Sequence, residues 1–270
     1  MTPADLQFAD RTQMTLHLAR TPGLPEWMRP ELDARFAKNR LRLARLREAF
    51  AEASHALRDV EFVVLKGFTH HWFGIDPEAR VQHDIDLLLQ PDSLEAATKA
   101  LTSIGYRPHG RELSREHTPP LVRPFTWEWR GDWYDSDLPI SLELHTTIWD
   151  SQRDRIRFPE VKTFWDRRQG QQLDPHDIVA FAALHGLRHT LRNNIKPAPL
   201  YELSVLLRRL ASDEAWWAEW NHRYDYDFRL LQAVAFRFAS EWFDSPRSEE
   251  HTSELQSHHD LVCRLLLEKK

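Results

Sequence analysis

Two aspartates, Asp84 and Asp86, are separated by one residue in an otherwise apolar run. Successive side chains of a strand point to opposite faces, so both carboxylates would share one face while Ile85, Leu87 and Leu89 line the other. Two carboxylates held side by side repel each other, and a divalent cation or a catalytic task offsets that cost. The pattern is short and common, so it leaves two interpretations open: a metal site and a solvated strand edge.

A third acid stands on a second predicted strand, residues 140–148. Alternation there places Ser141, Glu143 and His145 on one face and the leucines between them on the other. Glu143 is therefore a candidate third carboxylate. Its longer side chain is also suited to a structural ion pair with an arginine or a lysine.

The elements that must position these acids follow the order strand, helix, strand, helix. A long helix with one apolar face is predicted over residues 31–57, and it has the composition of a scaffold. The other predicted elements are a buried strand over 61–65, a short helix over 67–73, a strand over 83–90, a helix from Asp92 or Ser93 to about Ile104 with Gly105 as its stop, and a strand over 123–129 that pairs as a hairpin with the strand over 140–148.

Beyond Trp149 the pattern becomes helical. Asp174 is placed as a cap, with Pro175 at the first helical position. Helices are predicted over residues 178–192, over 200–210 and from 214 to about 243, with Pro197 and Pro199 breaking the first two apart. Tryptophans cluster in two places, and packing is favoured over the stacking of a base or an acceptor; the clusters are Trp127, Trp129 and Trp133, and Trp216, Trp217 and Trp220.

Composition narrows the class of protein. A chain of 270 residues with 41% hydrophobic content can bury a sizeable core and is globular. A formal charge of −5 gives no general basic field, so no general nucleic-acid affinity is indicated. No apolar run reaches the roughly 20 residues that span a bilayer, and the first residues lack the plan of a secretory signal, so we expect no membrane association and a cytoplasmic location.

The segment 247–270 resembles a translated sequencing adapter. It includes Arg247-Ser248-Glu249-Glu250-His251 and holds Cys263, the single cysteine of the chain. We interpret the segment as a non-native artefact, with an amphipathic tail helix as the alternative. Cys263 therefore supports no inference about thiol catalysis, zinc or disulfides.

Several of these motifs together resemble the uncharacterised nucleotidyltransferase group of the polymerase-beta-like superfamily. The resemblance covers roughly residues 30–210 and rests on Leu65-Lys66-Gly67, Arg80, Asp84-Ile85-Asp86-Leu87, Leu101 with Gly105-Tyr106, Leu144-His145 and a helix bearing His185. Such proteins place two aspartates on one strand and a third acid on a neighbouring strand, around two divalent metal ions. The resemblance implies Asp84, Asp86 and Glu143 as catalytic acids and metal ligands, with Mg²⁺ or Mn²⁺ as the cofactor, because hard cations prefer oxygen ligands.

The resemblance also implies a nucleotide-binding side. The superfamily's usual Gly-Ser or Gly-Gly appears here as Lys66-Gly67-Phe68-Thr69, so Lys66, Gly67 and Arg80 are expected to contact the triphosphate. Lys66 is equally suited to pairing with a carboxylate, and Arg80 to bracing Asp84 or Asp86.

Three residues are expected around this site: Thr69, His145 and His185. His185 and His189 share a helical face, but Gly186 stands where a zincin needs its glutamate, so packed histidines are favoured.

We therefore expect an α+β protein whose nucleotidyltransferase domain has a mixed sheet with flanking helices. The predicted divisions are an N-terminal helical segment (1–57), the nucleotidyltransferase domain (58–150), a helical unit (151–246) and the adapter-derived tail (247–270). The expected reaction is transfer of a nucleoside monophosphate from a nucleoside triphosphate to an unknown hydroxyl or phosphate by a two-metal mechanism. The alternatives are a non-catalytic regulatory or antitoxin-like module that retains the fold, and an Asp-x-Asp glycosyltransferase. The acceptor and the oligomeric state are not indicated.

Overall fold

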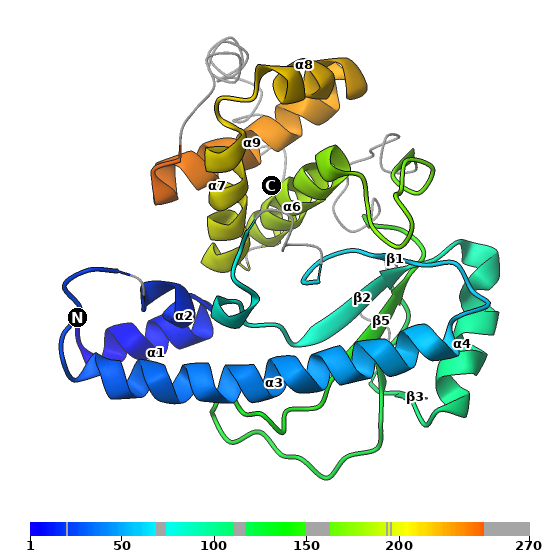
Figure 1. The fold of residues 1–270 in the computed structure, drawn as a ribbon, viewed down its shortest axis with the longest axis horizontal. Helices are drawn as coiled ribbons and strands as arrows, with labels where there is room; N and C mark the ends of the chain where they lie inside the picture. The colour runs from blue at the N-terminus through cyan, green and yellow to red at the C-terminus, as the bar shows by residue number, and fades with distance from the viewer. Residues whose placement is uncertain are drawn as a thin grey trace. The chain divides into compact units, whose positions relative to one another are not determined.

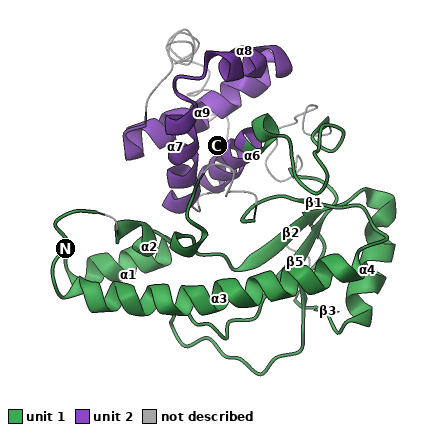
Figure 2. Ribbon diagram, viewed as in Figure 1, with its two compact units in different colours: residues 1–178 green, residues 179–270 purple. Residues whose placement is uncertain are grey.

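The computed structural model describes residues 1–19, 21–68, 74–110, 117–149, 163–192, 194 and 196–245 (Figure 1). The chain divides into two compact units, residues 1–178 and 179–270 (Figure 2). The first unit contains the sheet and the N-terminal helices. The second contains most of α6 (Pro175–Leu191) and the helices after it.

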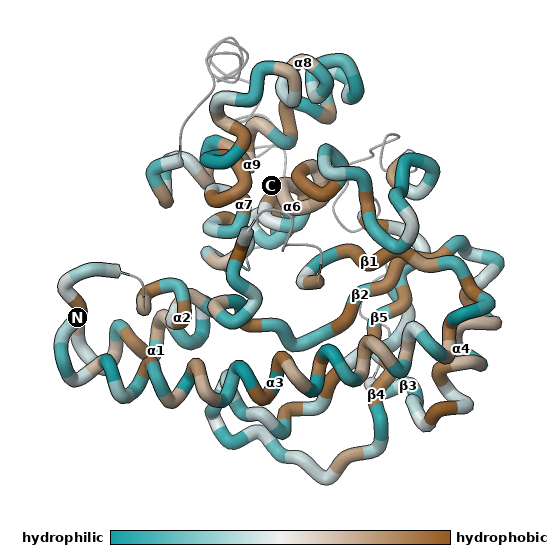
Figure 3. Tube along the Cα trace, in the orientation of Figure 1, coloured by the Kyte–Doolittle hydropathy of each residue, from teal (hydrophilic) through white to brown (hydrophobic). Residues whose placement is uncertain are grey.

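Helix α3 (Met28–Ala56) is the long helix predicted over residues 31–57. It follows two shorter helices, α1 (Pro3–Arg11), which Thr2 caps, and α2 (Thr15–Leu18). Hydrophobic and hydrophilic stretches alternate along α3 (Figure 3). The apolar positions Leu46, Ala49 and Ala53 are buried in the core cluster that also contains the sheet leucines, so α3 packs on the sheet as the predicted scaffold.

The sheet has five strands among the described residues, in the order β1-β2-β5-β4-β3. The two strands at its centre, β2 (Asp84–Leu88) and β5 (Ser141–His145), are parallel. The other pairs are antiparallel, which makes the sheet mixed as predicted; they involve β1 (Val63–Val64), β3 (Arg107–Pro108) and β4 (Leu121–Val122).

One face of the central strands is apolar and covered by helices. Ile85 and Leu87 of β2 and Leu142 and Leu144 of β5 are fully buried, in one cluster with residues of α3 and of α4 (Leu94–Ser103). Short 3₁₀ segments at Pro77–Ala79 (η2) and Pro91–Ser93 (η3) lead into and out of β2. Gly105, with φ +99°, follows α4 as the predicted stop, because glycine adopts this left-handed conformation without a Cβ clash.

The strand predicted over residues 123–129 is wrong. Within the described range 117–149 no strand covers it, and β4 at Leu121–Val122 pairs antiparallel with β5 instead, through Leu121 and Leu142. Pro124 has no N–H to donate to a ladder, and the alternating aromatic side chains are not a buried strand face. Trp129 is half exposed, whereas the indole of Trp127 donates to Asp135 Oδ2 at 2.8 Å.

The described part of the second unit, residues 179–270, consists mainly of helices, whereas the helical unit was predicted over residues 151–246. Asp174 Oδ1 accepts from the backbone N–H of His176 at 3.0 Å, so the expected cap opens α6 at Pro175. Pro197 lies in the first turn of α7 (Pro197–Leu210), where its missing N–H costs nothing, and not between helices as expected.

The single helix predicted from residue 214 to about 243 is also wrong, because two helices occupy that range. α8 (Glu214–Arg223) ends at Tyr224, whose backbone is extended, and Asp225 caps α9 (Tyr226–Phe243) by accepting from Phe228 N at 2.8 Å. The packing predicted for the second tryptophan cluster is confirmed: Trp216, Trp217 and Trp220 are buried, and the Trp220 indole donates to Gln232 Oε1 at 2.9 Å. Among the described residues, no helix has the length and apolarity needed to cross a membrane.

Candidate metal and nucleotide site

The acids of the predicted site lie on the face of the sheet opposite the apolar core. Asp86 of β2 is the register partner of Glu143 on β5, and Asp84 is the partner of Ser141 two residues earlier. The expected alternation is therefore present, with Ile85 and Leu87 in the core between and after the aspartates. Asp86 is 1% exposed, so it is not part of a solvated strand edge.

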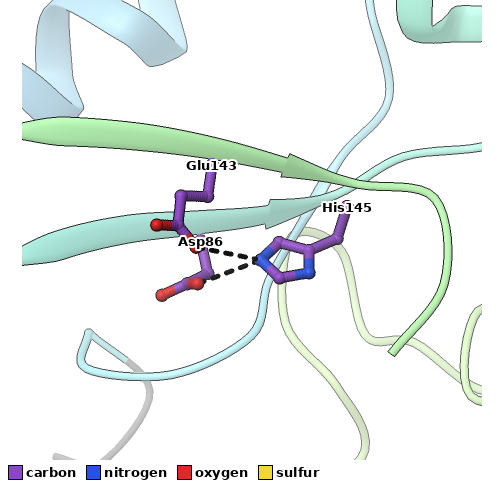
Figure 4. A group of neighbouring side chains, drawn as sticks. All are labelled: Asp86, Glu143 and His145. Atoms are coloured by element: carbon purple, nitrogen blue, oxygen red, sulfur yellow. Dashed lines mark hydrogen bonds and ion pairs between the residues drawn. The ribbon is translucent and has the colours of Figure 1, made fainter. Parts of the chain in front are cut away.

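His145 joins these two acids (Figure 4). Its Nε2 lies 3.0 Å from Asp86 Oδ1 and 3.8 Å from Glu143 Oε2. Each of the three side chains offers one ligand atom, and these atoms lie within 4.8 Å of one another. The structure thus brings Asp86, Glu143 and His145 together as a group able to hold a metal ion.

Lys66 completes the pairing of the aspartates. Its Nζ lies 3.1 Å from Asp86 Oδ2 and 3.4 Å from Asp84 Oδ2. The structure therefore shows the carboxylate pairing that the sequence left open for this lysine. Burial alone would raise the pKa of Asp86, but the Lys66 ammonium and the hydrogen bond with His145 more than offset it and hold the pKa below its usual value.

Gly67 follows Lys66 in a conformation that only glycine adopts without strain, with φ +73°. A Cβ at this position would come within 2.3–2.5 Å of the side-chain end of Gln82. Gln82 Nε2 in turn donates to the backbone oxygen of Asp84 at 2.8 Å, and Arg80 Nη1 donates to Gln82 Oε1 at 3.2 Å. Gln82 thus links the predicted nucleotide-binding residue Arg80 to the start of β2 and lies close against Gly67.

Two positioning residues on α3 were missed by sequence reasoning. Arg42 is fully buried and donates to three backbone oxygens, those of Gln82 at 2.9 Å, His83 at 3.1 Å and Leu138 at 2.7 Å. Asn39 Nδ2 donates to the backbone oxygens of Glu78 at 2.7 Å and Arg80 at 3.1 Å.

Burial lowers the pKa of Arg42 to about 10, which leaves the guanidinium charged at neutral pH. One feature of the sequence could have identified these two residues as buried. Asn39 and Arg42 are three residues apart on the same helical stretch as the apolar positions Leu43 and Leu46. These two side chains anchor the backbone that leads into the aspartate strand.

His117 is a third residue that the sequence did not reveal. Its Nε2 lies 3.7 Å from Glu143 Oε2, and its ring centroid is 5.0 Å from that of His145. The two histidines form an isolated antiparallel bridge, so a short backbone pairing brings them together. A bridge of one residue pair has no periodicity in the sequence, so it could not be predicted from a pattern.

Two further predicted residues, Thr69 and His185, belong to other parts of the chain. Thr69 lies outside the described residues, as does the tail 247–270. His185 belongs to the second unit, where its Nε2 lies 3.2 Å from that of His189 on the same helix. The two rings are 4.7 Å apart, so these histidines contact each other.

The donor set fits a divalent cation. Two carboxylates and an imidazole converge, and burial lowers the pKa of His145 below its usual value, which favours the neutral form that binds metals. The Asp86 carboxylate is already paired with the Lys66 ammonium, because a buried charge is costly without a charge of opposite sign nearby.

Comparison with known proteins gives one relationship. Neither the curated proteins nor the solved structures contain a match to this chain. A family model described as an uncharacterised nucleotidyltransferase matches residues 14–244, which include both central strands and all the acids of the site. The chain therefore belongs to this family of uncharacterised nucleotidyltransferases.

Proposed function

We propose that this protein transfers a nucleoside monophosphate from a nucleoside triphosphate to a hydroxyl or phosphate acceptor. In this reaction the acceptor oxygen attacks the α-phosphorus, and the bond from that phosphorus to the pyrophosphate oxygen breaks. The observation that carries the proposal is the pairing of Asp86 with Glu143 across the central parallel strands, with Asp84 beside them, in a member of a nucleotidyltransferase family.

We assign Asp84, Asp86 and Glu143 as the residues that hold divalent cations, Mg²⁺ or Mn²⁺. Bound there, the cations would favour formation of the attacking oxyanion and neutralise charge on the leaving pyrophosphate. Glu143 is the less buried of the two paired acids, with a side chain 18% exposed against 1% for Asp86. This exposure suits it to orient the acceptor hydroxyl and accept its proton.

Lys66 and Arg80 supply positive charge for the triphosphate in this proposal. The Lys66 ammonium is held against Asp84 and Asp86 and would become available to a phosphate oxygen once a divalent cation neutralises these carboxylates. Gly67 keeps the backbone beside Lys66 free of a side chain, which permits close approach of a phosphate.

The test is incubation of the protein with α-labelled nucleoside triphosphates, Mg²⁺ or Mn²⁺ and a cell extract that supplies the acceptor. We expect label on an extract component with the wild-type chain and none with Asp84→Asn/Asp86→Asn, in which each side chain keeps its size but loses its charge. The matched control is Asp92→Asn, an exposed aspartate beyond the end of β2. Label transfer that persists in the double variant would contradict the roles assigned to Asp84 and Asp86. Metal-independent nucleotide binding without transfer would favour the non-catalytic module instead.

A further inference from the structure

The group formed by Asp86, Glu143 and His145 contains an imidazole. A magnesium site built from oxygen ligands alone has no need of one. His145 is 5% exposed, and its Nε2 is 3.0 Å from one acid and 3.8 Å from the other. A six-coordinate cation with ligands at ~2.1 Å spaces neighbouring ligand atoms by about 3 Å and opposite ones by about 4.2 Å. The 3.0 Å separation matches neighbouring ligand atoms, and the 3.8 Å separation lies between the two values, so Nε2 is near enough to both acids to share a cation with them.

The contact between His145 and Asp86 is itself informative. A carboxylate oxygen and an unprotonated imidazole nitrogen 3.0 Å apart repel each other unless a proton or a cation lies between them. Either one therefore satisfies this pair. When a cation does so, the neutral ring carries its proton on Nδ1.

A second imidazole faces the same glutamate. His117 Nδ1 lies 2.7 Å from the backbone oxygen of Thr118, to which it donates. In the neutral ring this bond leaves the lone pair on Nε2, the nitrogen 3.7 Å from Glu143 Oε2. A backbone carbonyl on the far ring nitrogen is the arrangement that orients a metal-binding histidine.

We propose that the cation held by Asp86 and Glu143 is a first-row transition-metal dication, Mn²⁺ in preference to Mg²⁺, with His145 Nε2 as a ligand and His117 as a second imidazole beside Glu143. This inference rests on the proposed function, because it refines the identity of the metal in the same site. Imidazole is a ligand of first-row transition metals, and Mn²⁺ is the transition metal that also suits carboxylates, whereas Mg²⁺ is bound through oxygen and keeps several waters.

The decisive measurement is pulsed electron paramagnetic resonance of Mn²⁺ bound to the full chain. We expect the ¹⁴N modulation of a coordinated imidazole in the wild type and its loss in His145→Gln. Glutamine keeps an amide N–H that can donate to Asp86 but brings no imidazole nitrogen. Absence of nitrogen modulation from bound Mn²⁺, or absence of Mn²⁺ binding, would overturn the inference.

The affinities for Mn²⁺ and Mg²⁺ distinguish a residue that coordinates the cation from one that only positions another ligand. We expect His145→Gln to weaken Mn²⁺ binding by at least the ~10-fold that loss of an outer-shell partner costs, with little change for Mg²⁺. His117→Asn keeps the donation to Thr118 and should weaken Mn²⁺ binding less than His145→Gln does. His222→Gln, on the exposed side of α8, is the matched control and should change neither affinity. Equal weakening of Mn²⁺ and Mg²⁺ by His145→Gln would show that the histidine only positions Asp86.

The two proposals fail in different ways. If label transfer occurs but bound Mn²⁺ shows no nitrogen ligand, the metal assignment is wrong and the transferase stands. If Mn²⁺ is bound with a nitrogen ligand but no nucleotide is transferred, the metal assignment stands and the proposed reaction is wrong.

Discussion

At the scale of single residues, the positive charge beside the two aspartates comes from Lys66. Its side chain is 17% exposed and pairs with both aspartates. Removing one partner of a largely buried ion pair leaves uncompensated charge, which costs about 3 kcal/mol. We therefore expect Lys66→Met to lower the melting temperature of the metal-free protein and to enlarge the increase in melting temperature that Mn²⁺ produces.

Thermal unfolding with and without Mn²⁺ measures this effect, because a ligand that binds only the folded state stabilises it according to its affinity. Lys99→Met, at an exposed position of α4, is the control. Equal melting temperatures for the wild type and Lys66→Met in the absence of metal would contradict the pairing.

Gly67 permits a second prediction at this scale. Gly67→Ala meets both the left-handed backbone and the Gln82 side chain, so the variant must displace Gln82 from its bonds to Asp84 and Arg80. Gly23 has nearly the same φ, +75°, with nothing within 4 Å of its Cβ position, so Gly23→Ala costs only the ~1–2 kcal/mol of left-handed strain.

Denaturant titration should show that Gly67→Ala is more destabilising than Gly23→Ala by about 1–2 kcal/mol, the value of the two displaced hydrogen bonds. In a Gln82→Ala background this excess should disappear. A Gly67→Ala cost that is the same with and without Gln82 would show that the close approach is unimportant.

At the scale of elements, α3 holds the entrance to β2 as well as the core. Arg42 donates to the backbone oxygens of Gln82, His83 and Leu138, just before β2 and β5 begin. We expect Arg42→Met to destabilise the chain by about 3 kcal/mol or more, because hydrogen bonds from charged groups contribute ~1.5–3 kcal/mol each. Amide hydrogen exchange should accelerate in residues 78–84 before it does in α4.

Arg47→Met, on the exposed side of the same helix, is the matched control, and it should leave exchange in that segment unchanged. Uniform acceleration throughout the first unit by Arg42→Met would show a general loss of stability with no particular effect on the entrance to β2.

The two central strands, in which apolar and polar residues alternate, were predicted correctly from the sequence. Features that depend on one cap or one tertiary contact were missed. The alternation in residues 84–88 placed Asp84, Asp86 and the core leucines correctly because a buried face imposes period two. The break at Tyr224 depends on one cap, Asp225, inside a range of helical composition, and was missed. His117 and Arg42 reach the site through tertiary contacts with distant backbone, which local pattern does not encode.

At the scale of the whole molecule, the last described helix, α9, ends before the segment that resembles an adapter. Asp244 adopts the left-handed conformation that ends α9, and Ser240 Oγ donates to the backbone oxygen of Ser245 at 2.9 Å. Deleting residues 247–270 should therefore change the free energy of unfolding by no more than about 0.5 kcal/mol. Urea titration of the two chains measures the difference, and a larger loss would show that the segment is a native part of the protein.

The parallel pairing of β2 with β5 also determines when the site can exist. Parallel neighbours need a long crossover, and here the chain between them includes α4, β3 and β4. Closing this loop costs entropy before Asp86 meets Glu143, so a nascent chain lacks the group of Asp86, Glu143 and His145 until β2 and β5 have paired. A bound metal ion would then stabilise only chains in which the sheet is complete. Chains released early from synthesis would not bind the metal.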